Sequence, residues 1–367
     1  MIPQKIFQLA LASALSFKLL ALSPCPNMEE HKKYEPPKPV EKPAQPCYTP
    51  PPPPPKLVCH EEPECPPMEV LCDAGPRVCM GSDVFFTASF ILWSVHQEGT
   101  EFAMSGVGTN PSKGQLNDVD YGLEPGFKVG LGYAAPHDGW DLFASYTWLH
   151  ASADASTGGT DTVTLITAFN TQLQEARANW NLKFNVIDLE LGRNFFASKF
   201  LKLRPFVGFK GTWQDQDYVV DYIGTNVIFG ARKDRIDQNF WGFGMRAGMN
   251  TAWHFTNDWS IIGNFALSAL WSGYDTDLTV IDTMIGVQDT DLDTKNNFHS
   301  VSPVLELMIG IRYETWFYHD EYHIAIDAGW EEQVWWGHNR YVVINQPQRN
   351  GGDLTFQGLT LTFRFDF

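Results

Sequence analysis

The last nine residues of the chain, 359–367, alternate strictly between apolar and polar side chains. The odd positions hold Leu, Leu, Phe, Phe and Phe, and the even positions hold Thr, Thr, Arg and Asp. Because successive side chains of a β-strand point to opposite faces, this segment is expected to form a strand with one apolar and one polar face. Such a strand, ending on an aromatic residue, is typical of an outer-membrane β-barrel, in which one face meets lipid and the other a wet lumen.

The same period of two recurs from residue 83 onward. It predicts about ten antiparallel strands, within a range of about eight to fourteen. They are expected at 84–97, 124–134, 140–150, 177–194, 203–214, 238–253, 259–273, 300–316, 322–335 and 359–367. In the fourth strand the apolar positions change phase after Val186, which predicts a β-bulge there. The fold class is therefore all-β, an antiparallel transmembrane β-barrel over residues 82–367.

The connections between these strands alternate in length. Those after even-numbered strands, such as 134–139, are short, and those after odd-numbered strands, such as 98–123, are long. Outer-membrane barrels show this alternation because tight turns face the periplasm and longer loops face the outside. An even number of strands then places both termini in the periplasm. A soluble barrel or sandwich would have to bury about ten aromatic-rich faces in one core, which favours the membrane barrel.

The N-terminal part of the chain differs in composition from the barrel region. Residues 1–23 are expected to be a signal peptide, because Lys5 precedes an apolar stretch too short and interrupted to cross a bilayer as a helix. Residues 24–81 hold 17 of the 24 prolines and all six cysteines. With too few apolar residues to form a core, they are expected to be a disordered, Pro/Cys-rich periplasmic arm.

The cysteines of the arm are candidates for disulfide bonds, because an exported chain reaches an oxidising compartment. The candidates are Cys47, Cys59, Cys65, Cys72 and Cys79. They are expected either to close local loops or to cross-link neighbouring porins or periplasmic proteins. Lipid attachment at Cys25 is an alternative, but Pro24 is the wrong residue to precede a lipidated cysteine.

The polar faces of the predicted strands carry charged residues that are expected to line the lumen. These are Lys128, Asp141, Lys183, Asp188, Glu190, Lys210, Arg246, Glu306, Arg312, Glu314, Asp327, Glu331 and Arg364. Opposite charges either pair and fill the lumen, or line a water path and set its ion selectivity. About ten strands give a narrow barrel, since eight leave room only for side chains. The sequence leaves both alternatives open.

Motifs that would indicate an enzyme do not occur. The sequence holds no nucleophile elbow, phosphate-binding loop or metalloprotease His-Glu motif. No catalytic residue, metal or cofactor is therefore predicted. The formal net charge of −17 argues against nucleic acid as a partner.

Several segments resemble the Legionella-type major outer membrane proteins, which are also found in chlamydia-related bacteria. The resemblance lies in Ala88-Ser89-Phe90-Ile91-Leu92-Trp93 and in the segments 126–133, 138–142 and 146–150. It implies a pore-forming barrel in bacterial outer-membrane lipid that lets ions and small hydrophilic solutes diffuse passively. The C-terminal aromatic residues Phe363, Phe365 and Phe367 resemble the signal read by the barrel-assembly machinery.

Two other functions are compatible with the sequence. One is a structural envelope protein or surface adhesin with a plugged lumen, cross-linked through its Cys-rich arm. The other is an outer-membrane hydrolase, which would need a carboxylate or histidine cluster at the outer rim. The Pro/Cys-rich arm lies outside the pattern of the family that the barrel resembles.

Overall fold

The computed structural model describes residues 83–106, 113–135, 138–159, 161–166, 173–224, 230–284, 287–319, 321–341 and 352–367. The expected signal peptide, the Pro/Cys-rich arm and all the disulfide candidates lie outside these residues. The chain divides into two units, 1–66 and 67–367, and every described residue belongs to the second unit. No helix among the described residues is long and apolar enough to cross a membrane.

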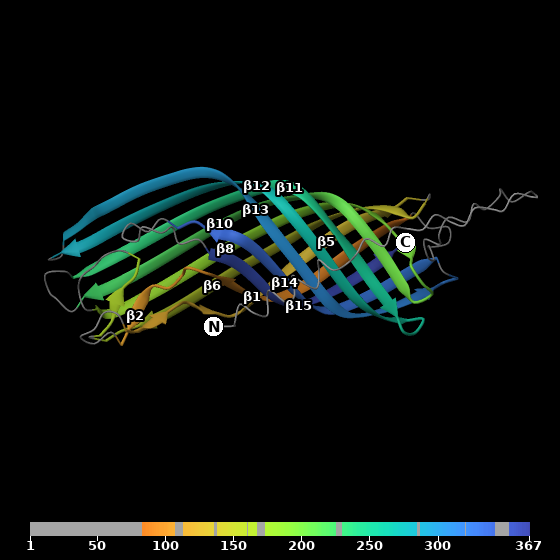
Figure 1. The fold of residues 1–367 in the computed structure, drawn as a ribbon. Coiled ribbons are helices and arrows are strands. Elements are labelled where there is room, and N and C mark those ends of the chain that lie inside the picture. Colours follow the sequence, from red (N-terminus) through yellow and green to blue (C-terminus); the bar gives the residue numbers. More distant parts are fainter. Residues whose placement is uncertain are drawn as a thin grey trace, which may run out of the picture. The chain divides into compact units, whose positions relative to one another are not determined.

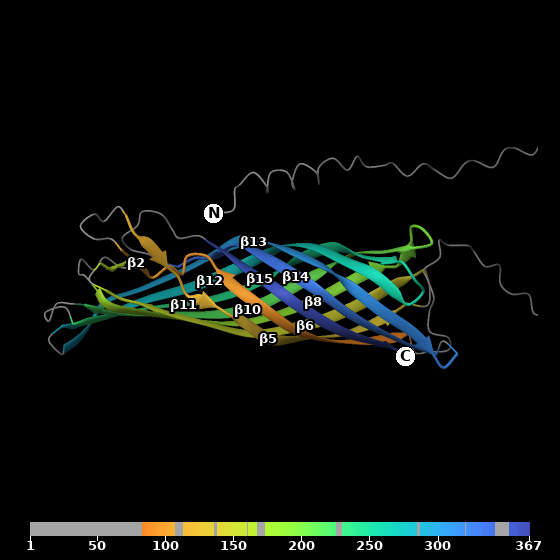
Figure 2. The same cartoon turned by 90° about the horizontal axis from the view of Figure 1, so that it is seen from below.

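Ten long strands of the described chain pair into one closed antiparallel ring (Figures 1 and 2). In ring order they are β1 (Val84–Gln97), β5 (Leu123–Ala134), β6 (Trp140–Thr157), β8 (Leu173–Arg193), β10 (Leu201–Gly224), β11 (Ala231–His254), β12 (Trp259–Met284), β13 (Val287–Phe317), β14 (Tyr322–Asn339) and β15 (Gly352–Asp366). The ring closes because β15 pairs with β1, from Phe85 opposite Asp366 to Gln97 opposite Leu354. The predicted barrel of ten strands is confirmed.

Five short strands of the described residues accompany the ring. β2 (Ala103–Ser105), β3 (Gln115–Asn117) and β7 (Val163–Thr164) form a small separate sheet, while β4 (Asp120–Tyr121) pairs with β6 and β9 (Phe195–Phe196) pairs with β10. Figure 1 shows β2 at the end of the barrel away from the C-terminus. We call that end of the barrel the distal end, and the end that holds Val84 and Asp366 the terminal mouth.

A belt of apolar side chains surrounds the part of the barrel next to the terminal mouth. On β11, Trp241 and Trp253 point outward at 49% and 52% exposure, with Phe243, Met245 and Met249 exposed between them. Twelve residues along a strand tilted by about 45° span roughly 28 Å, close to the hydrocarbon thickness of a bilayer. We call this part of the barrel the membrane zone.

Beyond the belt the two faces of the strands exchange their polarity. On β8, Ile187, Leu189 and Leu191 are exposed in the membrane zone, whereas Phe184 and Trp180 farther along are buried at no more than 1%. Both neighbours of β8 pair with it without a register shift around Val186, so the predicted bulge is wrong. The strand stays regular, and its inner face changes from charged to apolar. We call this part the distal zone.

The distal zone also explains why several strands are longer than expected. The segments 215–237 and 274–299 were expected as long loops, but most of their residues extend β10, β11, β12 and β13. In these residues the alternation is the reverse of that in the membrane zone. Apolar side chains such as Tyr218 and Leu278 point inward, and polar side chains such as Asp217 and Asp277 point outward. The residues up to Met284 in β12 and from Val287 in β13 therefore lengthen a hairpin of the ring.

Candidate functional site: the lumen

The predicted lumen residues lie on the inner face of the barrel, with one exception. Lys183 is exposed on the outer face of β8, between the inward and buried Leu182 and Phe184. It belongs to the distal zone, where the faces are inverted, so its assignment to the lumen was wrong. The inward set is Lys128, Asp141, Asp188, Glu190, Lys210, Arg246, Glu306, Arg312, Glu314, Asp327, Glu331 and Arg364.

A cluster of ion pairs occupies the middle of the membrane zone. Lys210 is 1% exposed, and its Nζ lies 2.8 Å from Asp188 Oδ1 and 2.7 Å from Glu306 Oε1. Arg246 donates to Glu306 Oε2 at 2.6 Å and also pairs with Glu190. These residues come from β8, β10, β11 and β13, so the cluster joins four strands of the ring, with β12 lying between the last two.

Arg204 belongs to this network but was not predicted. Its Nε lies 2.9 Å from Asp141 Oδ2, and its Nη1 lies 2.8 Å from Glu190 Oε2. The sequence did contain a signal for it, because Arg204 is in phase with Lys210 on the same strand. It lies one residue inside the predicted start of that strand, at Leu203, so a full list of its inward positions would have included it.

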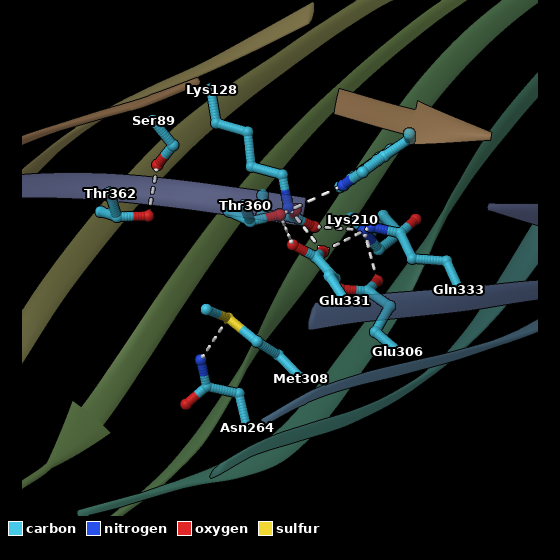
Figure 3. Close-up of polar contacts among 12 residues, drawn as sticks. Ser89, Lys128, Lys210, Asn264, Glu306, Met308, Glu331, Gln333, Thr360 and Thr362 are labelled. Carbon is cyan, nitrogen blue, oxygen red and sulfur yellow. Dashed lines mark hydrogen bonds and ion pairs between the residues drawn. The ribbon is translucent and has the colours of Figure 1, made fainter. Parts of the chain in front are cut away.

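A second cluster faces the same lumen from β5, β14 and β15 (Figure 3). Lys128 Nζ is 2.6 Å from Glu331 Oε1 and 4.5 Å from the centre of the Trp93 ring. Glu331 also accepts hydrogen bonds from Gln333 Nε2 at 2.9 Å and Thr360 Oγ1 at 3.0 Å. Every oxygen of this carboxylate is therefore engaged.

The membrane zone holds a cavity between these charged groups. Its volume is about 240 Å³, and its walls include Ser89, Ser145, Asn250 and Asn264 as well as the ion pairs. A cavity with polar and charged walls of this kind can bind water molecules. Toward the terminal mouth, Arg312 forms a two-point ion pair with Asp327, with both distances 2.7 Å.

Aromatic side chains fill the lumen in the distal zone. Phe184 of β8 lies 5.5 Å from the ring of Trp335 on β14 and 4.5 Å from Phe356 on β15. β8 and β14 are five strands apart in a ring of ten, so these two walls are opposite one another. Trp93, Trp180 and Trp335 are all buried at no more than 1%. Side chains from opposite walls thus meet across the lumen.

The segment Gly337–Tyr341 adds to this filling, and we call it the plug segment. Gly337 has a φ of 60°, in the left-handed region that glycine tolerates, and the register of β14 with β15 shifts here. The chain then bends into the lumen, where the Tyr341 hydroxyl donates to Gln216 Oε1 at 2.8 Å and accepts from Trp180 Nε1 at 3.2 Å. Burial raises the pKa of Tyr341.

His338 of the plug segment is 1% exposed and has apolar neighbours. Its ring lies 4.6 Å from Phe240, and its Nδ1 is 3.2 Å from Gln216 Nε2. Burial, together with the charge of Arg340, lowers the pKa of His338 to about 3. The imidazole is therefore neutral at ordinary pH, as packing against aromatic rings requires.

Comparisons with known proteins assign the barrel to a family. Residues 77–367 match the model of a family described as Legionella pneumophila major outer membrane protein precursor. The chain belongs to this family. It is therefore an outer-membrane β-barrel protein of bacteria, as the resemblance of its strand segments implied. No curated protein matches the chain.

Solved outer-membrane barrels are similar to the chain at low identity. The outer membrane protease OmpT of Escherichia coli is 10% identical, covers 80% of this chain and 99% of its own, and gives a TM-score of 0.41. The toluene transporter TodX of Pseudomonas putida is 9% identical, with coverages of 80% and 91% and a TM-score of 0.33. A major outer membrane protein of Thermus thermophilus is 11% identical, with coverages of 76% and 98% and a TM-score of 0.26.

Proposed function

We propose that this family member is a structural and surface-exposed barrel of the outer membrane whose lumen is plugged at rest. The observation that carries this proposal is the contact between opposite walls, where Phe184 meets Trp335 at 5.5 Å across the ring. Fully buried aromatic rings in contact leave no room for water between them. A solute that entered the membrane zone would meet this layer.

The ion pairs of the membrane zone support the same function. Each carboxylate in the two clusters lies within 3.0 Å of at least one basic side chain, as Glu306 does of Lys210 and Arg246. Paired charges tie neighbouring strands together and satisfy one another in a site shielded from bulk water. The proposal includes no catalytic step.

Passive diffusion of ions and small hydrophilic solutes is a second candidate function. It is favoured by the charged cavity of about 240 Å³ in the membrane zone. In this function the aromatic layer of the distal zone is the barrier to flow, and conduction needs that layer to open. The two candidates therefore differ in whether the layer opens under working conditions.

Planar-bilayer conductance separates the two functions. We expect silence from the wild-type protein and discrete channel steps from the double variant Phe184→Ala/Trp335→Ala, in which the meeting rings are removed. Trp213→Ala is a matched control, because Trp213 is 44% exposed on the outer face; it should be silent. Discrete steps from the wild-type protein would establish the diffusion function instead. Heat-modifiable migration on gels confirms that each variant is folded.

We further propose that the terminal mouth and both chain termini face the periplasm, and that the distal zone faces the outside. The polar outer surface of the distal zone suits water, and β1, the strand that begins the barrel, starts at the terminal mouth with Val84. The barrel-assembly machinery and, through arm disulfides, neighbouring envelope proteins are the proposed partners. Non-reducing gels of the wild type and of a variant with Cys47, Cys59, Cys65, Cys72 and Cys79 changed to Ser test the cross-links.

A further inference from the structure

The terminal mouth contains a second cavity, separate from the ion-pair clusters of the membrane zone. Its volume is about 420 Å³, in the range of sites that hold small organic molecules. Basic side chains dominate its charged wall, with Lys199, Lys202, Arg312 and Arg364 against Asp83, Glu314 and Asp366. His254, His323, Trp316 and Phe196 complete the part of the wall used here.

Lys202 differs from the other basic residues that point into the barrel around it. It occupies an inward, partly buried position of β10, opposite Ala252 of β11. Among the described residues, six inward basic residues of the membrane zone each have a carboxylate oxygen within 3.0 Å; they are Lys128, Arg204, Lys210, Arg246, Arg312 and Arg364. Within the described part of the chain, Lys202 has no ion-pair partner.

Two of the three carboxylates of this cavity, those of Glu314 and Asp366, already contact other groups. Glu314 Oε1 lies 2.9 Å from His254 Nε2, and Asp366 lies 2.6 Å from Arg364 Nη2 and 2.7 Å from His323 Nδ1. A partly buried ammonium without a counter-charge is costly, and buried charges in proteins are normally paired. Because Arg312 and Arg364 have carboxylate partners and Lys199 is exposed, Lys202 is the partly buried basic group of this wall without a carboxylate partner among the described residues.

We propose that the cavity at the terminal mouth binds a small oxyanion, with Lys202 as its main ligand. The guanidinium groups of Arg312 and Arg364 line the same cavity and add to its positive field. Phosphate, free or carried by a small organic molecule, has the required chemistry, and Trp316 and Phe196 give an organic part apolar wall to contact. This site is independent of whether the distal zone conducts.

Equilibrium dialysis of the folded, full-length protein against radiolabelled inorganic phosphate tests the proposal. At low ionic strength we expect saturable binding at one site. Lys202→Met should weaken it by about tenfold or more, the worth of a charge-assisted hydrogen bond. Lys202→Arg keeps the charge and should restore most of the affinity. Lys183→Met is the matched control, because Lys183 is exposed on the outer face, and it should bind as the wild type does.

The two sources of the anion are distinguished by competition. Displacement of phosphate by glucose 6-phosphate, but not by glucose, indicates that the cavity accepts an organic phosphate. Failure of glucose 6-phosphate to compete indicates free phosphate as the ligand. The proposal is overturned by absence of saturable binding to the wild-type protein, or by a Lys202→Met variant that is folded by heat-modifiable migration and binds phosphate as tightly as the wild type.

Discussion

Replacing Arg246 by Met is expected to destabilise the barrel strongly. The side chain of Arg246 is 10% exposed. Its guanidinium lies 2.6 Å from Glu306 and 3.6 Å from Asp188, and also pairs with Glu190. Methionine is similar in length and apolar, so the change removes the charge with little loss of packing. The carboxylates of Asp188, Glu190 and Glu306 then keep contacts only with Lys210 and with Nη1 of Arg204 among the ion pairs described above.

The size of the effect follows from this sharing. Removing one partner of a buried ion pair costs about 3–5 kcal/mol, because the remaining charge stays desolvated. Lys210 still contacts Asp188 and Glu306, and Arg204 still contacts Glu190. We therefore expect the lower end of the range, about 3 kcal/mol of the free energy of unfolding.

Arg235→Met is the matched control on the same strand. Arg235 also forms ion pairs, at 2.7 Å with Asp217 and 2.9 Å with Asp237, but it lies on the outer face and is 51% exposed. Exposed pairs of this kind contribute about 0–1 kcal/mol, since water screens them. The two variants differ in the environment of the charge and agree in the chemistry of the substitution.

Urea unfolding in detergent micelles, followed by tryptophan fluorescence, measures both free energies. Heat-modifiable migration gives an independent check that each variant has formed the barrel. Equal losses of stability in the two variants, or an Arg246→Met variant as stable as the wild type, would refute the reasoning. Either outcome would show that the charges of the lumen are screened by water as effectively as those on the surface.

Three further predictions concern other parts of the structure. His338→Gln should flatten the pH dependence of the free energy of unfolding. The pKa of His338 is lowered to about 3 from an ordinary 6.5, so its contribution to stability is present above pH 6.5 and is lost as the pH falls toward 3. In the wild type this loss is at most about 5 kcal/mol. Gly208→Ala should prevent folding, because its Cβ would collide with the Leu189 carbonyl oxygen. Gly211→Ala should be neutral, since the nearest atom to its Cβ would be Phe243 Cδ2 at 3.9 Å. Heat-modifiable migration compares the two variants, and equal behaviour would contradict the prediction. If the terminal aromatic residue is an assembly signal, Phe367→Ser should lower the amount of barrel assembled in cells. Phe90→Ser, also at a lipid-facing position, is the control and should assemble more fully. Equal assembled amounts of the two variants would argue against the signal.

The strands could be predicted from the sequence because their signal is local. In the membrane zone every second side chain contacts lipid and the others face the lumen, so apolar and charged residues alternate within a few positions of one another. Segments such as 84–97 and 322–335 show this pattern and form strands close to the predicted bounds. The inward direction of Lys210 or Glu306 follows from the same alternation.

The predictions that failed have a common physical cause. An alternating pattern states that two faces differ, but the surroundings decide which face is inside. Beyond the membrane belt the outside is water, so the apolar face of β8 turns inward at Trp180 and Phe184, and Lys183 points out. Interpreted with a single rule for the whole strand, this inversion was mistaken for a bulge, and the lengthened strands of the distal zone were mistaken for loops.

The sequence by itself determined that this chain forms a ring of amphipathic strands, because period and phase are properties of neighbouring residues. Tertiary structure alone decided which side chains meet across the lumen, since Phe184 and Trp335 are 151 positions apart and come together only when the ring closes. Closure also decided which charges find partners: Lys210 reaches two carboxylates, and Lys202, eight positions earlier on the same face, reaches none in the described chain. Pairing over such distances depends on the register of every intervening strand, which no local pattern records.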